Sequence, residues 1–235
     1  MNVLTTERIP IKNWATQTEE GVYAQARNLA NLPFAVKHVA LMPDAHTGYG
    51  MPIGGVLATE SAIVPNAVGV DIGCGVLAVQ TTIELGAISA SIEAILQEIA
   101  SAVPTGKNWH TTLSQHPVFD APPDIDIVSG QITNARKQLG TLGGGNHFIE
   151  LQAAPDDSVF IMIHSGSRNL GHKVATYYDR AARLLNALWH SEVPKEWELA
   201  FLPLSEPVSR EYLAAMRYCM EFAEHNREFM LAMVF

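Results

Sequence analysis

The stretch VGVDIGCGVLAVQTT, residues Val68–Thr82, joins a glycine-rich turn to an apolar run. The apolar part, Gly75–Thr82, predicts a buried strand, and the turn in front of it carries Asp71 and Cys74. Glycines in such a turn permit positive φ and close approach of the backbone, so both side chains can point at one ion. Taken alone, the turn fits either a metal site or a tight turn with a capping aspartate and a buried cysteine.

Two other segments place a histidine beside glycines at the end of an apolar run. In LGGGNHFIEL, Leu142–Leu151, three glycines and an asparagine precede His147, and a core histidine needs no such bare loop. In VFIMIHSGSRNLGH, Val159–His172, His164 closes an apolar strand, where a lone histidine is often a hydrogen-bonded core residue. A carboxylate, a thiolate and two imidazoles form a typical ligand set for a transition metal. The four predicted metal ligands are Asp71, Cys74, His147 and His164.

The composition of the 235-residue chain predicts a globular cytoplasmic protein. Its apolar content of 48% is enough for a substantial core. No apolar stretch approaches the roughly 20 residues that cross a bilayer, and no signal peptide opens the sequence. The formal net charge of -9 argues against general polyanion binding, so any RNA contact has to be local. Two cysteines make no disulfide framework, and Cys219, in an apolar helical pattern, is predicted to lie in the core.

Strands and irregularly spaced helices alternate along the chain, which predicts an α+β fold with mixed or antiparallel β-sheets and flanking helices. Pro43 is expected to end the first strand, Pro104 and Gly106 the first helix, and residues 105–125 are expected to form a loop. The predicted strands are Val36–Met42, Gly55–Thr59, Gly75–Thr82, His147–Gln152 and Ser158–His164. The predicted helices are Ile88–Val103, a segment from Ser167 to about Trp189, and a last one from about Ser209 to the end.

Together with MPDAHTGYGMPIGGV, residues Met42–Val56, these segments form four blocks whose order and separations resemble the RtcB family of RNA-splicing ligases. The resemblance implies a GTP- and manganese-dependent RNA ligase of tRNA splicing or RNA repair. Such an enzyme joins an RNA 3′-phosphate, or 2′,3′-cyclic phosphate, to a 5′-hydroxyl. In the implied mechanism a histidine attacks the α-phosphate of GTP, GMP passes to the RNA 3′-phosphate, and the 5′-hydroxyl displaces GMP. The implied partners are RNA with these ends, GTP and an archease-type activator protein.

The resemblance also implies two Mn²⁺ ions with a shared ligand. Asp71, Cys74 and His147 would hold one ion, and Cys74 would bridge to a second ion that His164 also binds. Thiolate and imidazole ligands accept zinc as well, so the identity of the metal rests on the resemblance.

The resemblance further implies that residues 146–150 contact GTP. The Asn146 amide can hydrogen-bond phosphate oxygens, Phe148 can lie against a purine, and Glu150 can accept hydrogen bonds from a guanine edge. Ile149 is expected to face the sheet, and strand core is an equal alternative for Phe148. The implied nucleotide-binding residues are Asn146, His147, Phe148, Ile149 and Glu150.

Two more residues are implied to take part in catalysis. Asp44, on an expected loop of the first block, would orient a metal ligand or act on the RNA end. The alternative is a local turn at Asp44 with His46 on the surface. Arg168 offers a guanidinium to phosphate, and its alternative is a surface ion pair at a helix start.

Members of the family continue further, with another metal-binding histidine and the histidine that becomes guanylylated. Neither is matched here, because His172, His190 and His225 fall outside the four blocks. The last helix also runs into MLAMVF, residues 230–235, without a capping glycine or a polar tail. We therefore expect residues 1–235 to be the N-terminal part of a single RtcB-like catalytic domain, truncated before its second half and unable to ligate RNA alone. Two other classes stay open: a metal-dependent phosphoesterase with water as nucleophile, and a non-catalytic metal- or nucleotide-binding remnant.

Overall fold

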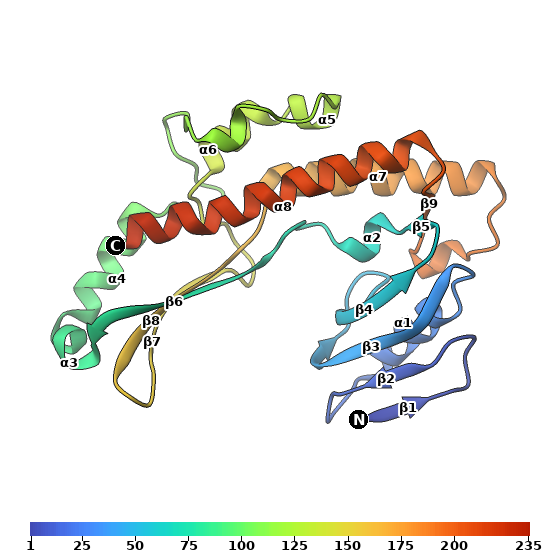
Figure 1. Cartoon of the computed structure of the whole chain (residues 1–235), viewed down its shortest axis with the longest axis horizontal. Helices are drawn as coiled ribbons and strands as arrows, with labels where there is room; N and C mark the ends of the chain where they lie inside the picture. Colours follow the sequence, from blue (N-terminus) through green and yellow to red (C-terminus); the bar gives the residue numbers. More distant parts are fainter. The chain divides into compact units, whose positions relative to one another are not determined.

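A three-stranded antiparallel sheet with the order β6–β8–β7 carries the segments that hold the predicted ligands (Figure 1). The computed structural model describes residues 1–235 and divides into two compact units. Unit 1 comprises Met1–Val70 and Ala175–Leu213, and unit 2 comprises Asp71–Val174 and Ala214–Phe235. All four predicted ligands therefore belong to unit 2. That both units form one catalytic domain stays a prediction.

The sheet of unit 2 has one face against a core and one face free of it. Along β8 every second residue from Val159 to Ser165 is buried, which is the period-two alternation of a strand. Ile161 and Ile163 pack with Val103 and Met230, whereas His164 lies on the opposite face of the strand. The strands are β6 (Gly75–Glu84), β7 (Phe148–Ala153) and β8 (Ser158–Ser165).

Short helical segments connect the strands of unit 2, and two long helices belong to both units. The short segments are α3 (Leu85–Ile88), η1 (Ser89–Ser91), α4 (Ile92–Ala102), η2 (Pro117–Phe119), α5 (Asp126–Ser129) and α6 (Ile132–Gln138). The long helices are α7 (Arg168–Leu188) and α8 (Pro207–Val234). None of the helices combines the length and apolarity needed to cross a membrane.

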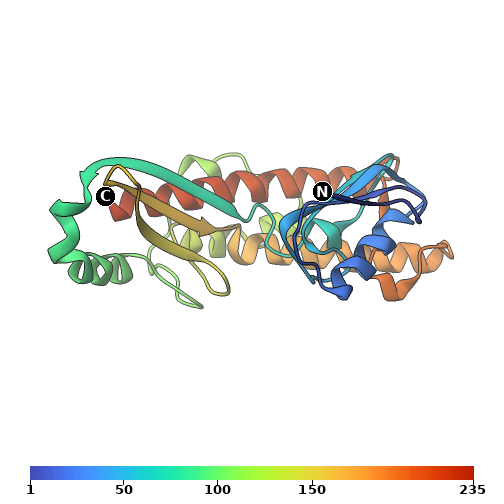
Figure 2. The same cartoon turned by 90° about the horizontal axis from the view of Figure 1, so that it is seen from below.

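Unit 1 contains a four-stranded sheet in the order β1–β2–β3–β4, in which β2 and β3 are parallel and the other pairs antiparallel. Helix α1 packs on this sheet through Val22 and Leu29, which join a buried cluster with Val39 and Leu41 of β3 (Figure 2). The elements are β1 (Asn2–Leu4), β2 (Ile11–Asn13), α1 (Glu20–Ala30), β3 (Ala35–His46), β4 (Ile53–Thr59), β5 (Ala62–Ile63), α2 (Pro65–Val68), η3 (Lys195–Trp197) and β9 (Leu202–Pro203).

The predicted α+β class is confirmed, but the prediction that Pro43 ends its strand is wrong. Strand β3 continues to His46, where it pairs with Ile53 of β4. The pairing register is irregular between Leu41 and His46, so Pro43 lies where the ladder needs no backbone N–H. Asp44 and His46 are consequently in a strand and not on a loop.

The helix predicted from Ile88 begins later. Ile88 ends the short helix α3, residues 89–91 form a 3-10 turn, and α4 starts at Ile92. The Ser89 hydroxyl donates a hydrogen bond to the Leu85 carbonyl at 2.6 Å, a local bond of the kind that competes with regular helix. The C-terminal end lies within one residue of the prediction, because α4 stops at Ala102, with Val103 as its C-cap before Pro104.

Candidate metal centre

The register of the unit 2 sheet brings three predicted ligands to one end of it. Phe148 at the start of β7 and Val76 near the start of β6 both pair with His164 near the end of β8. Cys74 and His147 directly precede those two strands, so they emerge at the same end. The Cys74 N–H donates a hydrogen bond to the Asp71 carbonyl at 3.0 Å. This turn brings Asp71, the fourth predicted ligand, to the same end of the sheet.

Short contacts link the four side chains one to the next, from Asp71 through His147 and Cys74 to His164. The Cys74 sulfur is 3.2 Å from Nε2 of His164 and 3.5 Å from Nε2 of His147. Oδ2 of Asp71 is 2.9 Å from the same Nε2 of His147. The candidate ligand atoms of Asp71, Cys74 and His147 all lie within 4.8 Å of each other. The sulfur therefore lies between two imidazole nitrogens, as a bridging ligand would.

Both imidazoles are oriented by a carbonyl behind them. Nδ1 of His147 is 2.9 Å from the Leu142 carbonyl, and Nδ1 of His164 is 3.1 Å from the Asn146 carbonyl. A carbonyl only accepts hydrogen bonds, so a hydrogen on Nδ1 would satisfy each carbonyl, and in both rings Nε2 faces the centre. Metal-binding histidines are typically held in this way. Nε2 of His147 and Oδ2 of Asp71, 2.9 Å apart, are therefore two candidate ligand atoms that face each other.

The thiol and the carboxyl of this centre have opposite pKa shifts. Burial and the neighbouring Asp71 carboxylate raise the pKa of Cys74 to about 12, against the smaller effects of Arg227 and Arg168. Burial alone would raise the pKa of Asp71, but hydrogen bonds from His147 and Cys74 and the nearby charges of His147 and Arg168 outweigh it and lower this pKa. Near neutral pH the metal-free centre thus holds a carboxylate and a protonated thiol.

Arg168 places a partly buried guanidinium beside the centre. Its Nη1 lies 3.3 Å from Nδ1 of His147, and its buried Nε has no hydrogen-bond partner in the protein. Burial lowers the pKa of Arg168 while Asp71 and Cys74 oppose this shift. The residue begins α7 with φ of 57°, a left-handed conformation that costs energy in a non-glycine residue. Strain and an unpaired donor at one position are typical of a functional residue.

Glycines make room for these charged groups. A Cβ on Gly143 would collide with the Arg168 guanidinium, and a Cβ on Gly166 would collide with the Asp71 carboxylate. Gly144, in the same loop as Gly143, has only an ordinary contact at 3.8 Å. The centre therefore needs the bare backbone at two particular positions.

We expect Gly166→Ala to weaken Mn²⁺ binding by about tenfold or more, because the added methyl displaces the Asp71 carboxylate. Isothermal titration calorimetry on the folded variant measures the change. Gly144→Ala is the matched control and should bind as the original chain does. Equal affinities for all three proteins would show that Asp71 is not a ligand.

The residues predicted to contact nucleotide are divided between the two faces of β7. Phe148 packs edge to face on His164 with ring centroids 5.3 Å apart, so it lies on the face of the centre. Glu150 is exposed and accepts a hydrogen bond from Gln152 at 2.8 Å. Ile149 instead packs against the core, so its side chain is turned away from a nucleotide on the other face. Asn146 is exposed in the turn before β7.

Asp44 belongs to unit 1, whereas the four candidate ligands and Arg168 belong to unit 2. Its side chain is exposed, and His46 places Nδ1 3.0 Å from the Asp44 backbone carbonyl. The catalytic role of Asp44 stays a prediction.

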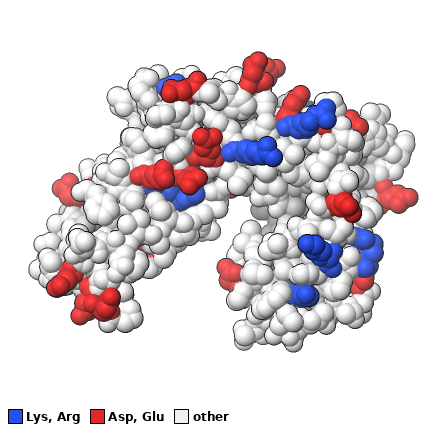
Figure 3. Space-filling view, viewed as in Figure 1, with Lys and Arg blue, Asp and Glu red and all other residues white.

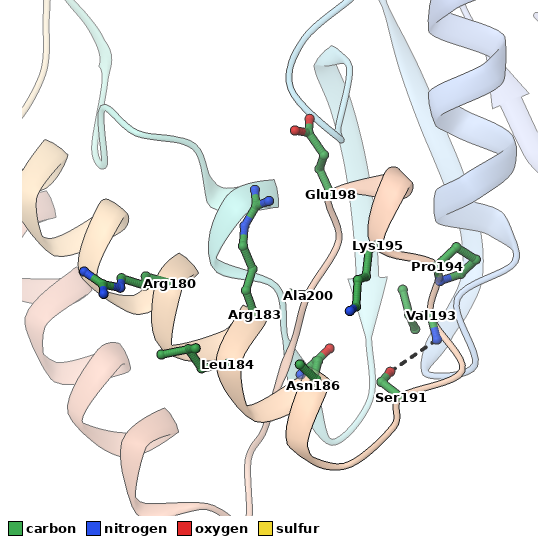
Figure 4. Close-up of a pocket in the computed structure, with 11 residues that line it drawn as sticks. Arg180, Arg183, Leu184, Asn186, Ser191, Val193, Pro194, Lys195, Glu198 and Ala200 are labelled. Atoms are coloured by element: carbon green, nitrogen blue, oxygen red, sulfur yellow. Dashed lines mark hydrogen bonds between the residues drawn. The ribbon is translucent and has the colours of Figure 1, made fainter.

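No second group of three or more possible metal-ligating side chains is found in the chain. On the face in Figure 3, acidic and basic side chains occur in small mixed groups. A pocket of about 300 Å³ in unit 1 has Arg183 and Lys195 directed toward it (Figure 4). Arg183 also pairs with Asp179 at 2.7 Å, and no cysteine or histidine lines this pocket. It lacks the convergent metal ligands of the unit 2 sheet.

Two residues of α8 beside the centre lie outside the four sequence blocks, so the motifs could not predict them. Asn226 is fully buried and Arg227 partly buried, and both bond to backbone atoms of the ligand-bearing loops. The signal in the sequence is a polar residue within an apolar helical stripe. That stripe consists of Cys219, Phe222, Ala223, Asn226 and Met230.

Known proteins are similar to this chain over most of its length. The chain matches the family model described as tRNA-splicing ligase RtcB over residues 25–121 and 120–235. RNA-splicing ligase RtcB of Escherichia coli (strain K12) is 35% identical over an alignment of 248 positions, which covers 97% of this chain and 60% of that protein. The tRNA-splicing ligase RtcB of Nanoarchaeum equitans is 31% identical over 277 residues, covering 94% and 57%. The protein of that name from Thermococcus kodakarensis is 31% identical over 253 residues, covering 87% and 52%. The chain thus spans less than two thirds of the length of these relatives.

Proposed function

The chain belongs to the tRNA-splicing ligase RtcB family, and on this basis we propose that it forms part of a GTP- and manganese-dependent RNA ligase. The proposed substrates are an RNA 3′-phosphate or 2′,3′-cyclic phosphate and a 5′-hydroxyl, in tRNA splicing or RNA repair in the cytoplasm. An archease-type protein is the proposed activator. The observation that carries the proposal is the Cys74 sulfur between the Nε2 atoms of His147 and His164.

The donor atoms fit a pair of divalent metal ions. Asp71, Cys74 and His147 would hold the first ion, and Cys74 and His164 would contribute to the second. An oxygen, a sulfur and two nitrogens suit a transition metal, and manganese is chosen among these by family membership. When bound, such ions neutralise phosphate charge and polarise phosphoryl oxygens.

The neighbouring side chains would bind and orient the nucleotide. The Arg168 guanidinium lies beside the centre, with Nη1 3.3 Å from Nδ1 of His147, and its charge and planar donors suit a phosphate group. Asn146 would donate to phosphate, Phe148 would pack against the purine, and Glu150 would accept from the guanine edge. All four are held near the ligand end of the sheet, at the start of β7 or of α7. The guanylylated histidine of the family is assigned to no residue of this chain.

Nucleotide binding tests this proposal. With GTP labelled at the α-phosphate, we expect Mn²⁺-dependent retention of GTP on filters and no covalent GMP adduct. Asn146→Ala should weaken retention by about tenfold, the order of one hydrogen bond to a charged group. Gln97→Ala, which removes an exposed amide on α4 beyond the far end of β6, is the control.

Three outcomes would contradict parts of the proposal. Retention without Mn²⁺ would separate the nucleotide from the metal centre. A covalent adduct would show that one of the unassigned histidines is the nucleophile. Metal-dependent release of phosphate from RNA 3′-ends without GTP would favour a phosphoesterase.

A further inference from the structure

We propose that Asn226 and Arg227, neighbours on α8, are positioning residues that hold the three ligand-bearing loops of the metal centre in register. The inference rests on the metal centre proposed above. Neither side chain forms a hydrogen bond with a candidate ligand atom, and both bond to the backbone beside the ligands. The charge of Arg227 also acts on the Cys74 thiol, and Arg227→Lys keeps that charge.

Asn226 uses its whole buried amide on two distant loops. Its Oδ1 accepts hydrogen bonds from the Gly140 and Thr141 N–H groups at 2.7 and 3.2 Å. Its Nδ2 faces the Thr141 carbonyl at 3.1 Å, the Ser165 hydroxyl at 3.2 Å and the Gly166 carbonyl at 3.3 Å. Burying an amide is costly unless such bonds are made. Because every position is used, the amide fixes one relative placement of the two loops.

The two loops held by this amide support two different ligands. The first loop leads to the Leu142 carbonyl, which accepts both from Nδ1 of His147 and from the Ser165 hydroxyl at 2.9 Å. The second loop contains Gly166, whose bare backbone lies against the Asp71 carboxylate. A shift of either loop would therefore move a ligand atom.

Arg227 ties the third loop to the same place. Its Nη1 donates to the Gly73 carbonyl and to the Ser165 carbonyl, each at 2.9 Å. Gly73 lies between the two ligands of the first turn, and Ser165 directly follows the histidine of β8. One nitrogen thus links the carboxylate–thiol turn to the end of the strand that carries the second imidazole.

Asn226 and Arg227 differ from ordinary core residues in the partners of their hydrogen bonds. The partners are 60 to 154 positions away along the chain, and each lies within seven residues of a candidate ligand. Phe222, also buried on α8, instead packs its ring on Phe119 at 6.0 Å between centroids. It therefore provides a matched variant that disturbs the helix packing and leaves the ligand loops bonded.

The test compares metal binding with stability in the full 235-residue chain. Calorimetry with Mn²⁺ gives affinity, and Co²⁺ reports the thiolate through its sulfur-to-metal charge-transfer absorption. We expect Asn226→Ala and Arg227→Met each to weaken Mn²⁺ binding by about 10–100-fold, the usual cost of losing an outer-shell partner. Arg227→Lys should recover part of the loss, because an ammonium can still donate to both carbonyls.

The controls separate positioning from folding. Phe222→Leu should lower the melting temperature without changing affinity or the Co²⁺ spectrum, and Glu224→Gln, on the exposed side of α8, should change neither. If Asn226→Ala does not fold, the comparison of Arg227→Met with Arg227→Lys decides the question.

Two results have separate meanings. If Cys74→Ala removes metal binding while the Asn226 and Arg227 variants bind as the original chain does, the positioning role is wrong and the centre stands. If Cys74→Ala leaves binding unchanged, the proposed centre itself is wrong.

Discussion

Replacing Cys74 by alanine is expected to abolish binding of both metal ions. Its sulfur lies 3.5 Å from Nε2 of His147 and 3.2 Å from Nε2 of His164, so a single side chain serves both proposed sites. Loss of an outer-shell partner alone typically costs about 10–100-fold in affinity, and a shared direct ligand should cost more for each ion. Titration calorimetry with Mn²⁺ should therefore show no saturable binding to Cys74→Ala.

The chain provides its own control for this experiment, because it has two cysteines. Cys219 is free and fully buried in α8, as its helical pattern predicts, and Cys219→Ala should keep both ions. His147→Ala should remove the ion that Asp71 also holds and weaken the other less. Loss of only one ion in Cys74→Ala would show that the sulfur does not bridge.

The convergence of the four side chains could be predicted because each follows from local sequence. The glycine-rich turn before Gly75 and the glycine run before His147 mark strand starts, and the apolar run before His164 marks a strand end. Antiparallel pairing of the three strands then places those ends together. Local signals thus mark the strand ends, whereas the order β6–β8–β7 that brings them together is given by the structure.

Other parts depend on contacts that no local pattern contains. The amide of Asn226 bonds to loops 60 to 86 positions earlier, which can be recognised only once α8 is placed beside them. Strand β3 continues through Pro43 because the pairing with β4 is irregular there, and a register is a property of two strands. The carbonyl behind each imidazole also comes from tertiary structure, although it decides which nitrogen faces the centre.

The affinity of the centre for Mn²⁺ is expected to rise steeply with pH. A pKa of about 12 for Cys74 means that the thiol is protonated at neutral pH, whereas a metal binds the thiolate. Binding must then release one proton, so the apparent affinity should increase about tenfold for each pH unit above pH 7. The sign follows from the raised pKa: lower pH keeps the proton on sulfur and opposes the metal.

Calorimetry in buffers of different ionisation enthalpy counts the released protons directly. About one proton per bridging thiol is expected for the original chain. In Cys74→Asp the replacing carboxyl is ionised in this range, so whatever affinity remains should show almost no proton release from that position. The same slope in both proteins, or none in the original chain, would mean that the sulfur is not a ligand. In that case Asp71 and the two imidazoles would have to hold any metal without it, and the bridging geometry at the end of β6 would have no chemical role.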